Sequence, residues 1–422
     1  SIGQLAFAHC RSLTTVVFGN RIQSIQKYQF YQSQAINTIF IGALVSSISN
    51  DLFLKPLNTI DVSLSNTDFK SIDNVLFAMN SSIIYYPYHN PTTNYTMPNT
   101  ISTLYNIPYA NLSTYLTNVH IPETVSQISE DFLQNYHLSI SLNPANPYYF
   151  SYNNGLYHRS TMTFVRYLQS STSFELLDNT TKIGSYAFAY STIRTLSIPT
   201  NVVQIDDYAF YRCLNLNSIT IPDNVTTLGI GVFQYCQSLT TCTLPRAMTS
   251  IPSYFFSNCS ALDSVALPTT IEQISEYAFA NCTSLYSISL SESLRAIYNG
   301  AFGNCSSLSY LIIPSLTSYI FSDAFGNCTR LRTVNIEGSL DKIYNFAFYQ
   351  CTGLTEVSSP NGISYIGPYA FANCGSLAKF SAKSIYEIDD NAFRSCTSLS
   401  NLSVTTNIPV IGAGAFYNCR FA

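Results

Sequence analysis

Apolar side chains recur along this chain with one long period. From Phe188 to Phe416 a phenylalanine follows at intervals of 23 residues, twice shortened to 22. The repeated unit is I-x-x-I-x-x-x-A-F-x-x-C-x-x-L-x-x-I-x-I-P, and residues 205–222 (IDDYAFYRCLNLNSITIP) show most of it. A fixed period of this length indicates a solenoid of stacked coils. Near the N-terminus the same interval separates Phe7, Phe30 and Phe53.

One segment of each unit predicts a short strand. Leu285, Ile288 and Leu290 end an alternating L-x-x-I-x-L stretch, whose apolar residues would point inward and whose intervening residues would point outward. A proline ends many of these strands, because it has no N–H for the sheet. These prolines are Pro199, Pro222, Pro245, Pro268 and Pro314. Stacking of the coils would pair the strands into one parallel sheet.

The A-F-x-x-C stretch predicts a short helical or irregular turn on the opposite side of each coil. Its alanine is small enough to let successive coils approach, and its phenylalanine would fill the interior. The expected fold class is therefore a repeat solenoid, α/β or mainly β. Short parallel strands would lie on one face and turns on the other.

In these residues the chain resembles the BspA-like leucine-rich-repeat family of surface proteins. The resemblance covers residues 1 to about 70 and 171–422, with eleven successive units in the second stretch. It implies display at a cell surface or secretion, and adhesion to host extracellular-matrix or cell-surface proteins or to other microbes. It implies no catalytic residues.

The repeat is irregular between residues 71 and 170, where only Tyr109 and Phe132 approximate the repeated phenylalanine. Residues 73–87 and 153–168 resemble each other, and each predicts a strand, a turn and a second strand. They are similar to the hairpins that BspA-like proteins insert between coils. We therefore expect N-terminal repeats at 1–70, irregular repeats with two hairpins at 71–170 and regular repeats at 171–422, in one continuous solenoid.

The composition argues against several classes of function. Charged residues make up 10% of the chain, and the net charge is −4. Since no run of Lys or Arg could neutralise a row of phosphates, nucleic acid is not an expected partner. No stretch reaches the length of a membrane span, so a membrane anchor would have to lie beyond this sequence. The five histidines form no metal or catalytic motif, and we expect neither an enzyme nor a cofactor.

Eleven of the twelve cysteines occupy one position of the repeat. Side chains at one position of stacked coils run parallel, which is poor geometry for a disulfide. A ladder of buried free thiols is therefore expected, and Cys242, at an inward strand position, should also be buried.

N-x-S/T sequons provide candidate N-glycosylation sites. Asn258, Asn281, Asn304 and Asn327 belong to the repeat's own Asn-Cys-Ser/Thr turn, where the side chain is better explained by hydrogen bonds within the turn. The better candidates lie in the irregular segment. They are Asn80, Asn94 and Asn111.

Two surfaces are candidates for protein binding. The outward positions of the predicted sheet hold mainly Ser and Thr, and Tyr310 and Ile312 form a bulky outward pair among them. This pair predicts either a contact anchor or cross-strand packing. The second surface is formed by the tyrosines of the irregular segment, which either contact a partner or pack the hairpins onto the solenoid. These tyrosines are Tyr85, Tyr86, Tyr88, Tyr95, Tyr105, Tyr148, Tyr149, Tyr152 and Tyr157.

Two functions fit these patterns. The first is a non-enzymatic binding scaffold at the cell surface, an adhesin for host or microbial proteins. The alternative is a structural or self-assembling surface-coat protein without a specific host ligand, in which exposed ends of the array stack on other copies.

Overall fold

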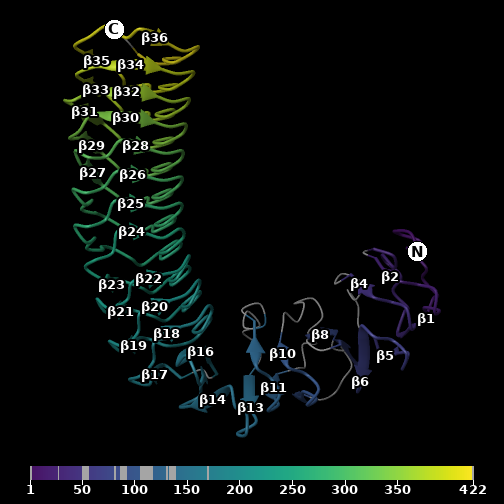
Figure 1. Ribbon diagram of the computed structural model, residues 1–422. Coiled ribbons are helices and arrows are strands. Elements are labelled where there is room, and N and C mark those ends of the chain that lie inside the picture. Colours follow the sequence, from purple (N-terminus) through teal and green to yellow (C-terminus); the bar gives the residue numbers. More distant parts are fainter. Residues whose placement is uncertain are drawn as a thin grey trace. The chain divides into compact units, whose positions relative to one another are not determined.

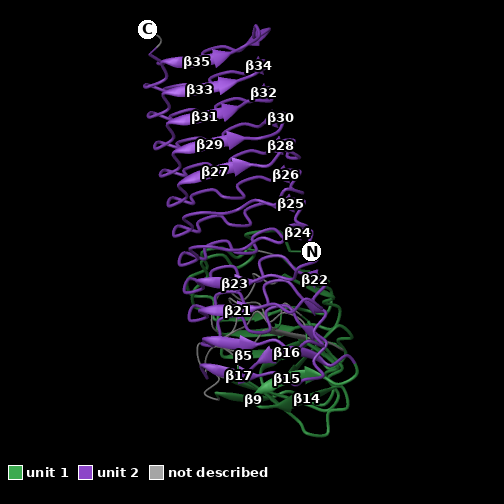
Figure 2. Cartoon of the chain, turned by 90° about the vertical axis from the view of Figure 1, so that its left-hand side faces the viewer, with its two compact units in different colours: residues 1–160 green, residues 161–422 purple. Residues whose placement is uncertain are grey.

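The computed structural model describes residues 2–26, 28–49, 57–79, 93–104, 117–129, 132, 139–168 and 171–420, and the backbone of 82–85. The chain divides into two compact units, unit 1 (Ser1–Ser160) and unit 2 (Thr161–Ala422) (Figure 2). The organisation expected above, with boundaries at 70 and 170, stays a prediction.

Unit 2 is a solenoid of stacked coils, as predicted (Figure 1). One strand of most coils joins a parallel sheet, and equivalent residues of neighbouring coils pair, as Tyr310 does with Thr333. The first block of this sheet contains β17 (Ser173–Glu175), β19 (Thr195–Ser197), β21 (Ser218–Thr220) and β23 (Thr241–Thr243). The second contains β27 (Tyr310–Ile313), β29 (Thr333–Ile336), β31 (Glu356–Ser359), β33 (Lys379–Ala382) and β35 (Asn401–Val404).

Two coils between these blocks depart from the prediction. Residues 261–267 and 284–290 form no strand, although Leu285, Ile288 and Leu290 are buried as expected. Only the start of the ladder remains there, where the Tyr286 N–H donates to the Asp263 carbonyl at 3.2 Å. These side chains therefore stay inward although the strand pairing is interrupted there.

A second parallel sheet lies beside the first and was not predicted. Most of its strands contain the isoleucine that stands four residues before the alanine of A-F in the unit. Two of these isoleucines, Ile274 and Ile297, are fully buried. One block contains β16 (Thr163–Tyr167), β18 (Lys182–Ile183), β20 (Gln204–Ile205) and β22 (Thr227–Leu228). The other contains β24 (Ser250–Ile251), β25 (Gln273–Ile274), β26 (Ala296–Ile297), β28 (Tyr319–Ile320), β30 (Leu340–Ile343), β32 (Ile363–Ile366), β34 (Ile385–Ile388) and β36 (Val410–Ile411).

The A-F-x-x-C stretches are irregular turns, and residues 171–420 contain no helix. The Phe279 N–H donates to the Ala301 carbonyl of the next coil at 2.7 Å, and the Phe279 and Phe302 rings stack with centroids 5.0 Å apart. Two residues of each turn adopt positive φ, for example Tyr277 (55°) and Asn281 (61°). Asparagine tolerates this conformation, which explains its recurrence before the cysteine.

All twelve cysteines are free thiols, and all but Cys10 and Cys419 are buried. Each ladder thiol from Cys213 to Cys419 reaches back to the preceding coil. Cys305 Sγ, for example, lies 3.2 Å from the Phe279 carbonyl oxygen, which also accepts the Cys282 N–H at 3.1 Å. Ser33 stands at the same repeat position, and its hydroxyl donates to the Phe7 carbonyl. The ladder therefore needs a small donor at this place, and cysteine supplies it with an apolar body.

Unit 1 contains coils of the same kind. Its parallel strands are β1 (Thr15–Val17), β3 (Thr38–Ile41) and β5 (Thr59–Val62), then β2 (Ser24–Ile25) and β4 (Ser47–Ile48). Further along the chain follow β9 (Asn94–Thr96), β11 (Asn118–Ile121) and β13 (Ser139–Leu142), then β10 (Thr103–Leu104) and β12 (Gln127–Ile128). Ile39, Ile41 and Ile60 are buried at the centre of its first core cluster.

Both predicted hairpin segments, 73–87 and 153–168, contain strands, but the antiparallel pairing begins earlier than expected in each. In the second segment the later expected strand is β16, which pairs in parallel with β18. Antiparallel β6 (Phe69–Ile72), β7 (Val75–Ala78) and β8 (Ser82–Tyr85) form the first, and β14 (Tyr149–Tyr152) and β15 (Gly155–His158) form the second. The Asp73-Asn74 and Asn153-Asn154 pairs both have positive φ, as two-residue hairpin turns require. These pairs were the signal for β6 and β14.

One buried asparagine attaches each hairpin to the coil before it. Asn146 Nδ2 donates to the carbonyls of Pro122 and Val125 at 2.8 and 3.0 Å, and its Oδ1 accepts the N–H groups of Tyr148 and Tyr149 at 2.9 and 2.8 Å. Asn66 makes the same four bonds before β6. Both amide hydrogens and both lone pairs of the side chain are thereby used inside the protein.

We expect Asn146→Asp to destabilise unit 1 by about 3 kcal/mol, because a carboxylate would face two carbonyl oxygens and could donate to neither. Asn143→Asp is the matched control. Among the described residues the Asn143 side chain donates no hydrogen bond and only accepts one, from the Ala145 N–H at 2.9 Å. Urea denaturation of the full chain with hydrogen exchange of residues 146–158 measures the effect. Equal exchange rates in the two variants would show that the asparagine does not hold the hairpin.

A second prediction concerns pH. Burial raises the pKa of the thiols of seven ladder or core cysteines above the ordinary value: Cys236, Cys242, Cys259, Cys282, Cys305, Cys328 and Cys374. Below about pH 8.5 these thiols are neutral in both the folded and the unfolded chain. Above it only the unfolded chain ionises, so the free energy of unfolding should fall by about 1.4 kcal/mol per pH unit for each thiol.

Guanidinium denaturation between pH 7 and 9.5 measures this slope. Cys305→Ser should fold, because Ser33 already occupies this repeat position in another coil. It should make the fall in the free energy of unfolding smaller by the contribution of one thiol, about 1.4 kcal/mol per pH unit. A free energy of unfolding that stays constant up to pH 9.5 would contradict the prediction.

Candidate functional site

The described residues contain no group of three or more His, Cys, Asp or Glu side chains placed to hold a metal ion. Nowhere in the described part of the chain is there a helix with both the length and the apolar character that crossing a bilayer requires. The features that stand out lie instead on the outward face of the first sheet in unit 2.

Six hydroxyl groups form two rows on this face. Thr195, Ser218 and Thr241 pair in register across β19, β21 and β23, and Ser197, Thr220 and Thr243 form the second row. All six residues are exposed. Within the part of the chain that the structure describes, none of these hydroxyls bonds to another protein group, so all remain free to donate and accept.

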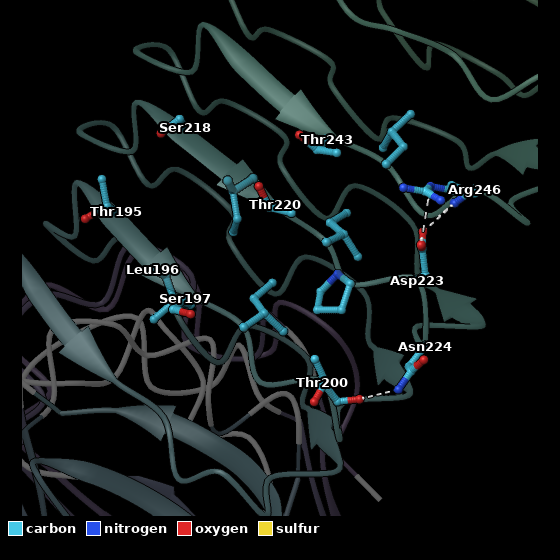
Figure 3. A pocket seen from close by; sticks show the side chains of 15 residues that line it. Thr195, Leu196, Ser197, Thr200, Ser218, Thr220, Asp223, Asn224, Thr243 and Arg246 are labelled. Carbon is cyan, nitrogen blue, oxygen red and sulfur yellow. Dashed lines mark hydrogen bonds and ion pairs between the residues drawn. The ribbon is translucent and has the colours of Figure 1, made fainter.

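Five of these six residues, all but Thr241, line a groove with a volume of about 890 Å³ (Figure 3). At its rim the Arg246 side chain lies 3.5 Å from Asp223, and the Arg246 N–H donates to the same carboxylate at 2.9 Å. Asn224 Nδ2 donates to the Thr200 carbonyl at 2.7 Å. The groove is therefore open and of mixed character, because Ile198, Ile221 and other apolar residues line it beside the hydroxyls, and its charged residues are already paired with each other.

Tyr310 and Ile312 lie on β27 and point outward, with 44% and 46% of their surfaces exposed. Their neighbours Leu311 and Ile313 are 1% and 0% exposed, because alternate residues of a strand face opposite ways. The next strand, β29, places the polar Thr333 and Asn335 beside them. The pair thus forms a small apolar patch on a face that is otherwise mainly polar.

Two further large apolar side chains of the same coil are exposed, one in the turn after β27 and one on β28 of the second sheet, and the sequence analysis missed them. Leu316 and Tyr319 follow in the same coil and are 52% and 38% exposed. We call Tyr310, Ile312, Leu316 and Tyr319 the apolar stripe. Tyr286, 60% exposed, lies in the preceding coil. The signal was available, since Leu316 and Tyr319 stand where the next coil has the polar Ser339 and Lys342.

The tyrosines of the irregular segment do not form one surface. Tyr148 and Tyr152 are exposed, whereas Tyr149, Tyr157 and Tyr95 are buried. Tyr149 packs edge-on against His158, and its hydroxyl accepts the Ile128 N–H at 3.2 Å. Tyr95, Tyr149 and Tyr157 therefore belong to the packing of unit 1 and are unavailable for contact.

Several candidate residues lie outside the described side chains. Tyr85 belongs to β8, of which only the backbone is described, and Tyr86, Tyr88, Tyr105, Asn80 and Asn111 lie outside the described residues. Asn94 is exposed on β9, and its Oδ1 accepts a hydrogen bond from Asn118. Glycosylation at Asn94 stays a prediction.

Comparison with known proteins gives consistent results along the whole chain. A family model described as a BspA type leucine rich repeat region matches residues 1–137, 85–172, 160–284, 249–377 and 319–422. No curated protein matches the chain.

Several solved structures share the fold. A leucine-rich repeat protein from Eubacterium ventriosum is 21% identical and covers 75% of this chain and 82% of its own, with a TM-score of 0.55. One from Bacteroides ovatus is 24% identical and covers 83% of this chain and 89% of its own, with a TM-score of 0.53. At these identities the likeness shows the fold alone.

We expect the double substitution Tyr310→Ser and Ile312→Thr to change the free energy of unfolding by less than about 1 kcal/mol, because both side chains are exposed. The same residue types, Ser218 and Thr220, occupy these positions on β21. Leu311→Ser, at the inward position between them, should cost about 3 kcal/mol or more. Thermal denaturation of the three proteins separates the cases, and a large loss in the double variant would show that the pair is packing.

Proposed function

Because the chain belongs to the BspA type leucine-rich repeat family, we propose that it is a non-catalytic scaffold that binds other proteins through the outward sheet face of unit 2. We further propose that it acts at a cell surface or in secreted form as an adhesin. Its partners would be host extracellular-matrix or cell-surface proteins, or proteins of other microbes.

The observation that carries this proposal is the exposure of Tyr310 and Ile312 on a face of small polar residues. Large apolar side chains surrounded by polar ones are typical of interface anchors, because a partner that covers them removes apolar area from water while the rim stays hydrated. Complete burial of a fully exposed side chain of this size contributes about 1.5–3 kcal/mol. Since a little under half of each side chain is exposed, covering the pair contributes about 1.5–3 kcal/mol in total, roughly a quarter of the binding energy of a micromolar complex.

The rigidity of the coils supports the same role. β27 pairs with β29. In the turn of the same coil, the Phe302 N–H donates to the Ala324 carbonyl of the next coil at 2.7 Å. Because hydrogen bonds fix both the strand and the turn of this coil, its backbone needs little ordering when a partner binds. Less of the binding free energy is therefore lost as conformational entropy. The strand therefore presents both anchors in one preorganised geometry.

The test is saturable binding of the labelled chain to intact epithelial cells, to immobilised extracellular-matrix proteins and to bacterial cells. We expect micromolar or tighter binding to at least one of these, weakened at least tenfold by Tyr310→Ser with Ile312→Thr. The matched control is Thr333→Ser with Asn335→Ser, which changes the same two positions of the next strand and should bind like the unchanged chain.

The absence of saturable binding to all three surfaces would refute the adhesin proposal. Light scattering over the same concentrations distinguishes the alternative of a self-assembling coat. A mass that rises with concentration, together with no surface binding, would favour that alternative.

A further inference from the structure

Three ion pairs of unit 2 each join residues at equivalent positions of neighbouring coils. Asp223 pairs with Arg246, Glu272 with Arg295 and Glu356 with Lys379, each across one coil. These pairs neutralise three of the basic side chains near the sheet face. The distance between Lys379 Nζ and Glu356 Oε1 is 2.7 Å, so this carboxylate is occupied.

Arg332 breaks this pattern. It is exposed, and within the described part of the chain its guanidinium forms no ion pair or hydrogen bond. Its coil neighbours are Ser309, whose carbonyl accepts the Arg332 N–H at 2.9 Å, and Thr355, whose N–H donates to the Arg332 carbonyl at 2.8 Å. Neither of these two neighbours carries a charge. The Glu356 N–H also donates to the Arg332 carbonyl, at 3.3 Å, but the Glu356 carboxylate pairs with Lys379.

This unpaired cation lies beside the apolar stripe. Arg332 immediately precedes Thr333, which pairs directly with Tyr310 on the neighbouring strand. Arg330, also exposed and without an ion pair among the described residues, lies two positions earlier. Two exposed arginines therefore precede the strand residue that pairs with Tyr310, although the whole chain has a net charge of −4.

We propose that the apolar stripe and Arg332 together bind a segment of a partner protein that carries an apolar side chain next to a carboxylate. The proposal rests on the protein-binding function above and specifies the partner. The apolar side chain would cover Tyr310 and Ile312, and the carboxylate would accept two parallel N–H bonds from the guanidinium, a geometry that lysine cannot reproduce. Binding would weaken as salt increases, because the charges are exposed.

The probe is a phage-displayed library of random twelve-residue peptides, selected on the full chain after removal of binders to the Tyr310→Ser, Ile312→Thr variant. We expect the selected peptides to be enriched in Asp or Glu within two residues of a Leu, Ile, Phe or Tyr. Synthetic versions should bind at least tenfold more weakly to Arg332→Gln in fluorescence anisotropy. Arg194→Gln is the control, because Arg194 is exposed at the same repeat position, before Thr195, with no apolar stripe beside it.

Selected peptides without acidic residues, peptides that bind Arg332→Gln as tightly as the unchanged chain, or no enrichment at all would each overturn the proposal. The result is independent of the cell-binding test. If cells bind through Tyr310 and Ile312 but the peptides show no acidic preference, only the partner class is wrong. If acidic peptides are selected but no cell or matrix surface binds, the adhesin role fails and the site remains.

Discussion

Backbone hydrogen bonding from each coil to the next is the interaction on which the structure of unit 2 depends. Along much of the unit it runs through the first sheet, the second sheet and the turn before each ladder cysteine. A coil alone cannot bury its apolar residues, so these bonds and the stacked core form together. Because they fix a residue opposite its equivalent one coil away, the Phe279, Phe302 and Phe325 rings stack at 5.0–5.1 Å.

The same constraint acts on the surface. A side chain on the outward face has neighbours set by the repeat length, so the Ser and Thr residues of β19, β21 and β23 align into rows. Charges also pair across one coil, as Glu356 and Lys379 do. Residues that break a row, such as Tyr310 and Arg332, are therefore conspicuous, since the stacking neither buries nor neutralises them. In the proposed function, the regular coils make the face rigid and the residues that break the rows select the partner.

The two hairpins show how the repeat accommodates insertions. Each follows a buried asparagine, Asn66 or Asn146, whose amide bonds to two carbonyls of the preceding coil. The positive φ of Asn153 and Asn154 then turns the chain back on itself. Tyr149 and Tyr157 are buried, so that of the described hairpin tyrosines only Tyr148 and Tyr152 are exposed. The tyrosine-rich composition of this segment thus reflects packing as well as surface.

The sequence by itself determined the solenoid, its inward positions, the free cysteine ladder and the outward placement of Tyr310 and Ile312, because a period of 23 residues constrains every coil alike. Only the tertiary structure decided which short segments pair. The second sheet uses strands as short as two residues, too short for an alternating pattern to reveal, and the coil at 284–290 has the pattern without the pairing. The contacts of Asn146, the burial of Tyr149 and the unpaired charge of Arg332 likewise depend on residues about one coil away. No local property of the sequence encodes those neighbours, because stacking alone brings them together.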